Sequence, residues 1–185
     1  MTFIFNDHHN LFGCHAFLGA SNYHWLNYSK EKLIATWHNS QAKERGTELH
    51  ALAERLITLK VKLPKNSSTL NSYVNDAIGF GMKPEVVLYY SPLCFGTADA
   101  VSFKRGQLRI HDLKTGETPA NMLQLKIYAA LFCLEYCQRP ENIGIELRIY
   151  QSDDIDICVP EAEEIASIMD RIIESDKILS ELKEE

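Results

Sequence analysis

Long apolar runs are missing from this sequence of 185 residues. A helix that crosses a membrane needs roughly 18 to 20 consecutive apolar residues, so we expect no membrane-spanning segment and no membrane partner. The N-terminal stretch also lacks the basic and long apolar segments of a secretory signal peptide, which predicts a cytoplasmic protein.

Cysteine is scarce and irregularly spaced. The five cysteines are odd in number and show no tight framework spacing, which favours a reducing compartment and mostly buried thiols over a disulfide scaffold. Hydrophobic residues make up 45% of the chain, so a sizeable core can form without disulfides or a structural metal.

An excess of positive charge is also missing. The formal net charge is -6, so no overall positive field attracts nucleic acid, and any nucleic-acid function has to come from a local site. Because no repeat and no linker rich in Gly, Pro or Ser is visible, we expect a single domain over residues 1–185. Its expected parts are a helical N-terminal part (1–39), a core (40–160) and a C-terminal helix (161–185).

Helical patterns dominate the N-terminal third. Ser21 and Ser29 are candidate N-caps of two short helices, and a stripe of leucines predicts a longer helix from Ser40 to Lys60. The stretch that follows, residues 63–72 (LPKNSSTLNS), has the composition of a loop.

The apolar period changes in the middle of the chain. Alternating or β-branched segments predict five strands: Glu85–Ser91, Thr97–Lys104, Gln107–Lys114, Ile143–Tyr150 and Ile155–Val159. Thr118 and Pro119 are the start signal of an apolar helix that runs to about Tyr136, and Pro160 begins an acidic amphipathic helix. This order predicts an α/β protein (α+β in type): a central mixed β-sheet flanked by helices, with a helical N-terminal segment.

One predicted hairpin carries the chemistry. Arg105-Gly106 is typical of a two-residue turn, and that turn would place Asp99 directly opposite Asp112. Two opposed carboxylates repel each other unless a cation lies between them. Both aspartates share the apolar face of the hairpin, where an unpaired charge is costly to bury.

Lys114 follows Asp112 by two residues, so its ammonium group can reach the same space. A carboxylate pair that holds a divalent cation beside a lysine is suited to phosphodiester cleavage. The two carboxylates and the backbone carbonyl of Leu113 would give Mg²⁺ the oxygen ligands it prefers.

The pattern also has an ordinary interpretation. A second acid-x-Lys triplet, Glu181-Leu182-Lys183, lies on a predicted surface helix where it carries no such meaning. A hairpin with one aspartate on each strand can equally be a solvated edge. The strand setting of Asp112 and the opposed Asp99 distinguish the hairpin triplet from chance.

Four ordered motifs add a family resemblance: GTELHALAE (46–54), GTADAV (96–101), HDLKTG (111–116) and QLKIY (124–128). Over residues 40–150 the chain resembles the PD-(D/E)xK nucleases of the RecB and phage-exonuclease-like branch. The resemblance implies a restriction-endonuclease-like core and a nuclease active site.

The resemblance also implies roles for individual residues. His50 would be an additional metal ligand, Asp99 and Asp112 the acidic metal ligands and catalytic acids, and Lys114 the catalytic lysine. Ala98 stands where the proline of the family name is expected.

A helix motif completes the implied set. Gln124 and Tyr128 match the Gln-x-x-x-Tyr motif and would position substrate or catalytic groups. Glu54 lies one turn after His50. It either orients the His50 ring without binding the metal itself or is merely solvated, and the sequence leaves both open.

Some members of this branch hold an iron–sulfur cluster with one early cysteine and a late group after the Gln/Tyr helix. Cys14 is early, but Cys133 and Cys137 fall within the predicted helix and Cys158 stands alone. We therefore expect Mg²⁺ or Mn²⁺ as the cofactor and no iron–sulfur cluster.

The resulting hypothesis is a metal-dependent deoxyribonuclease, with an exonuclease favoured, acting in phage or mobile-element recombination or repair. A phage-encoded protein would act on DNA in the host cytoplasm, and its further candidate partners are a recombination protein and a second copy of the chain. Candidate DNA contacts are the basic residues Lys60, Lys62, Lys65, Lys104 and Arg105. The alternative is a catalytically silent module of the same fold that binds DNA or a protein.

Overall fold

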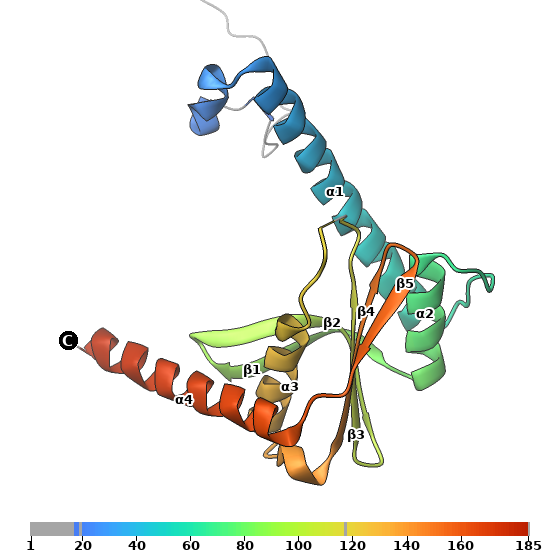
Figure 1. The fold of residues 1–185 in the computed structure, drawn as a ribbon, viewed down its shortest axis with the longest axis vertical. Coiled ribbons are helices and arrows are strands. Elements are labelled where there is room, and N and C mark those ends of the chain that lie inside the picture. The colour runs from blue at the N-terminus through green and yellow to red at the C-terminus, as the bar shows by residue number, and fades with distance from the viewer. Residues whose placement is uncertain (1–16, 19, 117, 185) are drawn as a thin grey trace, which may run out of the picture. The chain divides into compact units, whose positions relative to one another are not determined.

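The computed structural model describes residues 17, 18, 20–116 and 118–184, without the side chains of residues 20–23, 183 and 184 (Figure 1). Two compact units are present, Met1–Lys43 and Glu44–Glu185. The described part of the first unit contains the short 3₁₀ helix η2 (Ala20–Asn27) and the first turns of α1 (Lys30–Thr58). Cys14 lies outside the described residues.

Helix α1 replaces two of the predicted helices with one. Ser29 caps its first turn, as predicted, because the Ser29 hydroxyl accepts a hydrogen bond from the Lys32 N–H at 3.2 Å. The helix then continues without interruption to Thr58. The break expected before Ser40 is absent because no Pro occurs between Ser29 and Lys60 to end the helix.

The second unit contains the sheet and the remaining helices. Its further elements are α2 (Thr69–Phe80), β1 (Lys83–Ser91), β2 (Cys94–Lys104), β3 (Gln107–Leu113), α3 (Leu123–Glu135), η3 (Pro140–Asn142), β4 (Gly144–Gln151), β5 (Asp154–Cys158) and α4 (Ala162–Glu184). All five predicted strands are therefore confirmed, with ends that differ by a few residues.

The five strands form one mixed sheet in the order β1-β2-β3-β4-β5. The pair β3–β4 is parallel, whereas the other three pairs are antiparallel. Parallel neighbours need a crossover connection, and α3 provides it between β3 and β4. The predicted α/β architecture, a mixed sheet flanked by helices, is confirmed at this level.

The predicted loop over residues 63–72 is confirmed for residues 63–68, whereas residues 69–72 belong to α2. Ser68, at the N-cap position, makes no side-chain capping bond; instead Asp153, in the turn after β4, accepts hydrogen bonds from the Thr69 N–H (2.8 Å) and hydroxyl (3.0 Å). The helix start is thus stabilised by a residue 84 positions away in the sequence, a contact that local composition cannot indicate.

Helix α3 begins four residues later than Pro119 predicts, at Leu123. Gln151 at the end of β4 holds the preceding segment: its amide donates to the Thr118 carbonyl at 2.8 Å and accepts from the Ala120 N–H at 3.0 Å. These bonds engage backbone groups that a first helical turn would use, and Asn121 caps the helix instead by accepting from the Leu123 N–H.

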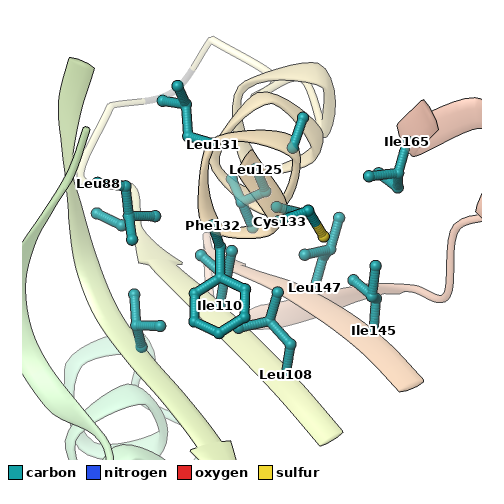
Figure 2. Close-up of a cluster of buried hydrophobic side chains, with 14 of the residues drawn as sticks. Leu88, Leu108, Ile110, Leu125, Leu131, Phe132, Cys133, Ile145, Leu147 and Ile165 are labelled. Carbon is teal, nitrogen blue, oxygen red and sulfur yellow. The ribbon is translucent and has the colours of Figure 1, made fainter. Parts of the chain in front are cut away.

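The larger core lies between the sheet and α3. Figure 2 shows Leu125, Phe132 and Cys133 of α3 directed toward Ile110 and Leu147 of the strands. Burial raises the pKa of the Cys133 thiol to about 11, so this thiol stays protonated at neutral pH. Burying these apolar side chains stabilises the sheet on its α3 side.

A second core fills the opposite side of the sheet, where α2 and the C-terminal turns of α1 pack. Its buried members include Ala53, Ile57, Val74, Leu113 and Tyr150. This packing fixes the position of α1 relative to β2 and β3, and so the position of any side chain that α1 presents to the ends of these strands.

A polar network lies beneath α2. The Tyr150 hydroxyl donates to Asp76 at 2.8 Å and lies 3.2 Å from His111 Nδ1. His111 is fully buried, and burial together with the nearby Arg148 and Arg109 lowers its pKa to about 3. His111 is therefore a neutral structural residue at physiological pH.

None of the described helices contains an apolar stretch long enough to cross a membrane. The four described cysteines, Cys94, Cys133, Cys137 and Cys158, are free thiols.

The larger core predicts the effect of a cavity mutation. Leu108→Ala removes a fully buried side chain and should lower the free energy of unfolding by about 2–5 kcal/mol. Leu182→Ala is the matched control, because Leu182 is 62% exposed and its loss should change stability by less than about 0.5 kcal/mol. Urea denaturation measures both; similar losses in the two variants would contradict the packing described.

Candidate metal centre

The hairpin of β2 and β3 has the predicted turn. Arg105 and Gly106 both have positive φ, 53° and 74°, as the two-residue type I′ turn requires. The predicted register is confirmed through five successive pairs, from Lys104–Gln107 to Ala100–His111.

The ladder ends before it reaches the two aspartates. Instead of a backbone pair at this level, the Asp99 carboxylate accepts a hydrogen bond from the Leu113 N–H at 2.8 Å. Two carboxylates directly opposed on one face would repel each other, and the parting of the strands avoids that pairing. Burial raises the pKa of Asp112, and the charge of Asp99, which still lies near, raises it further.

An acid on the neighbouring strand joins Asp99. The flanking pairs Pro84–Ala100 and Val86–Ala98 place Glu85 opposite Asp99, and this pair too is missing from the ladder. Glu85 has a φ of 48°, a left-handed conformation that costs a non-glycine residue about 1–2 kcal/mol. The regular ladder is thus interrupted on both sides of Asp99.

Three ligand-type side chains converge at this interruption. His50 of α1, Glu85 of β1 and Asp99 of β2 each offer one atom, and the three atoms lie within 4.8 Å of one another. His50 Nδ1 is 3.4 Å from the Asp99 carboxylate. One imidazole and two carboxylates form a donor set that Mn²⁺ and similar divalent cations accept, so the residues present fit such an ion.

The Asp112 carboxylate is paired with Lys114 and is not one of the three side chains that converge. Its side chain is 3% exposed, and the Lys114 Nζ lies 3.1 Å from Oδ1 and 3.0 Å from Oδ2. Only the Oδ1 contact has hydrogen-bond geometry, so the buried Oδ2 has no hydrogen-bond partner among the described residues. The observed cluster thus contains His50 and Asp99 of the predicted metal set and adds Glu85, and the role of Asp112 as a metal ligand stays a prediction.

A chain of hydrogen bonds extends from Lys114 to β2. Lys114 Nζ donates to the Gln124 amide oxygen at 3.0 Å, and the Gln124 amide nitrogen donates to the Tyr128 hydroxyl at 3.2 Å. The Tyr128 hydroxyl in turn donates to the Thr97 carbonyl at 2.7 Å. Since Gln124 and Tyr128 lie one turn apart on α3, this helix fixes where the lysine head group lies.

Two motif glycines permit close approach at the site. A Cβ at Gly46 of α1 would lie 2.7 Å from Thr115 Oγ1, directly after Lys114. A Cβ at Gly96 of β2 would lie 2.9 Å from the Tyr128 ring. Both glycines therefore bring a helix and a strand end closer together than a side chain would allow.

Burial dominates the electrostatics of the acids. It raises the pKa values of Asp99, Asp112 and Glu85 above their usual range. For Asp99, the Leu113 N–H and the nearby His50 and Lys114 oppose that rise. A bound cation would favour the charged forms of all three acids.

The remaining predicted residues have simpler surroundings. Glu54 is exposed and acts electrostatically on Glu85, whose pKa it raises. Leu113 joins the site through its N–H, and its carbonyl role stays a prediction. Lys104 is engaged elsewhere, because its ammonium group donates to the carbonyls of Phe80 and Gly81 at the end of α2. The other basic candidates, Lys60, Lys62, Lys65 and Arg105, are exposed.

Sequence reasoning did not identify Glu85 as a site residue. A hairpin closed tightly at Pro92 and Leu93 would put Glu85 opposite Ala100, and the register shift between Tyr89 and Ser91 puts it opposite Asp99 instead. The available sequence signal was an acidic residue at the start of a strand rich in β-branched residues. Its place in the site depends on the pairing of β1 with β2, which puts it opposite Asp99.

No protein-family model matches the chain, and no curated protein is similar enough to count as a relative. The function has to be argued from the arrangement of the side chains themselves.

The close approach at Gly46 predicts a mutational coupling. Alanine in place of a helical glycine normally gains about 0.5–1 kcal/mol of stability. Gly79→Ala in α2 should show this gain, because a Cβ there meets nothing within 4 Å. Gly46→Ala should not show this gain in stability, because the new Cβ would lie 2.7 Å from Thr115 Oγ1.

The double variant Gly46→Ala/Thr115→Ala should recover the gain relative to Thr115→Ala alone, since the crowded Oγ1 atom is then absent. Thermal or urea unfolding of the four proteins checks this coupling. Equal gains from Gly46→Ala and Gly79→Ala would show that α1 and the Thr115 loop do not approach as described.

Proposed function

We propose that this protein is a metal-dependent deoxyribonuclease with a restriction-endonuclease-like core of the PD-(D/E)xK type. The observation that carries the proposal is the convergence of His50, Asp99, Asp112 and Lys114 from α1, β2 and β3 at the point where β2 and β3 separate. These residues belong to three of the four sequence motifs, and the fourth motif contributes Gln124 and Tyr128.

Asp99, His50 and Glu85 would hold a divalent cation, and Asp112, whose buried Oδ2 has no hydrogen-bond partner among the described residues, is a further candidate ligand. When bound, Mg²⁺ or Mn²⁺ supplies a Lewis acid that polarises a phosphate oxygen and lowers the pKa of a coordinated water molecule. The acids contribute fixed negative charge that concentrates the cation at this point of the sheet.

Lys114 would act on the nucleophile and on the charge that develops at the phosphate. Its ammonium group is positioned by Asp112 and Gln124, and it can orient a water molecule by hydrogen bonding and stabilise added negative charge. Gln124 and Tyr128 contribute by positioning Lys114. Removal of either should misplace the ammonium group without removing it.

The favoured mode is exonucleolytic, in phage or mobile-element recombination or repair, and the substrate is DNA. A second possibility, a silent module of the same fold, has no structural feature in its favour, since every motif position carries a competent side chain. It is therefore treated as an outcome of the following experiment.

A cleavage assay tests the proposal directly. The wild-type protein with Mn²⁺ should degrade linear DNA, and Lys114→Ala should lower the rate by roughly 100-fold or more, because positioned proton-transfer and charge-stabilising groups contribute factors of this size. Lys177→Ala on α4 is the matched control, since that side chain is 76% exposed, and it should leave the rate unchanged. Equal rates in the wild type and Lys114→Ala would indicate contamination and leave only the binding module.

Metal binding can be tested without cleavage. Mn²⁺ should raise the melting temperature of the wild-type protein, and His50→Ala, Glu85→Gln and Asp99→Asn should each reduce that rise, because each removes a ligand atom of the cluster. His38→Ala is the control, an exposed histidine on the same helix.

Since imidazole favours later transition metals over Mg²⁺, Mn²⁺ should support cleavage at least as well as Mg²⁺. Strict Mg²⁺ preference would exclude His50 as a direct ligand.

A further inference from the structure

One face of the β1–β2 ribbon is left uncovered by the described residues. The alternate residues Val86, Leu88 and Tyr90 pack into the core against α3. Side chains alternate between the two faces of a strand, and those of the other face are exposed: Val87, Tyr89, Phe95 and Thr97. We call these four residues the ribbon strip.

Two aromatic rings form the far end of the ribbon strip. Tyr89 of β1 is paired with Phe95 of β2, and their ring centroids are 6.3 Å apart at an interplanar angle of 30°. The two residues are 44% and 61% exposed. Large aromatic side chains left this exposed contribute little to folding, and contiguous exposed apolar groups mark binding surfaces.

The ribbon strip leads to the metal centre. Glu85 precedes Tyr89 by four residues on β1, and Asp99 follows Phe95 by four residues on β2. Four residues of a strand span roughly 13 Å. Glu85 and Asp99 meet His50 of α1, and α1 packs on the side of the sheet opposite α3, so the aromatic pair and the acids lie along one side of the ribbon. A stacked strand with a rise of 3.4 Å per nucleotide would cover this length with about four nucleotides.

The chemistry of the ribbon strip selects the kind of ligand. Its four residues are uncharged and include no Lys or Arg, so it offers no positive charge to the phosphates of a duplex. Unpaired bases, in contrast, present flat faces that stack on aromatic side chains. The weakly tilted pair of Tyr89 and Phe95 offers such a surface.

We propose that Tyr89 and Phe95 form a stacking platform for the bases of single-stranded DNA, one of whose phosphates lies at the metal centre. The inference rests on the proposed nuclease function for the identity of the nucleic acid. It adds a substrate class: an unpaired strand, whether free or at the frayed end of a duplex.

Binding of a fluorescein-labelled oligothymidylate, followed by fluorescence anisotropy in EDTA, tests the platform without cleavage. The full-length wild type should bind, and Phe95→Ala or Tyr89→Ala should weaken binding by about ten-fold, since one stacked base contributes on this scale. Phe95→Trp should retain the affinity, because it preserves a stacking surface. Ile157→Ala is the control: this apolar side chain is 52% exposed on β5, at the opposite edge of the sheet from β1, and its loss should have no effect.

Three results would overturn the platform. The wild type could fail to bind the oligonucleotide, or Phe95→Ala and Ile157→Ala could bind it equally well. Sedimentation could also show a wild-type dimer that Phe95→Ala dissociates, which would make the ribbon strip a contact between two copies. Melting temperatures of the variants confirm that each is folded.

The nuclease proposal and the platform fail in different ways. Cleavage of single-stranded DNA with Mn²⁺ at an unchanged KM in Phe95→Ala would overturn the platform and leave the nuclease intact. Binding that depends on Phe95, without cleavage under any metal condition, would support the platform and overturn the nuclease. If both are right, Phe95→Ala should raise KM about ten-fold and leave kcat nearly unchanged, because stacking remote from the reacting phosphate affects ground state and transition state alike.

Discussion

The buried negative charge at the open end of one β-hairpin is the constraint that organises this site. Asp112 is 3% exposed and Asp99 17% exposed, and a carboxylate removed from water is unfavourable unless it is paired or hydrogen-bonded. The fold supplies part of the compensation through Lys114, His50 and the Leu113 N–H. The pKa values of both acids nevertheless remain raised, so compensation is incomplete and a divalent cation would complete it.

The rest of the second unit can be understood as support for that arrangement. The core beneath α3 fixes Gln124 and Tyr128, which hold the lysine head group. The opposite core fixes α1, and Gly46 allows α1 to approach the loop after β3 so closely that His50 reaches Asp99. The α3 side of the sheet therefore positions Lys114, and the α1 side positions His50, at the same ends of β2 and β3. Mutations far from the acids should act on the site through these two contacts.

The hairpin register, the turn and the strand assignments were accessible from the sequence because they depend on local signals. Arg105-Gly106 fixes the β2–β3 pairing within a few residues, and alternation fixes which side chains share a face. The position of Glu85 was not accessible, because it depends on a register shift in another hairpin. The start of α2 depends on Asp153, and the late start of α3 on Gln151. For the two helices, a contact distant in sequence overrides a local preference, and for Glu85 an irregularity near the hairpin turn shifts the register; one sequence without coordinates indicates neither.

An acidic protein that acts on a polyanion has to obtain affinity from something other than its overall charge. Here the net charge is -6, and Lys104, one of the few basic candidates near the hairpin, is committed to the end of α2. A divalent cation at the Asp99 cluster would provide local positive charge where the phosphate lies. Stacking on Tyr89 and Phe95 would add affinity that does not depend on charge and is insensitive to salt, in contrast to lysine–phosphate contacts, which weaken steeply as salt rises. In the proposed function the two features would be complementary: the cation would select a phosphate, and the aromatic pair would select a strand whose bases are free to stack.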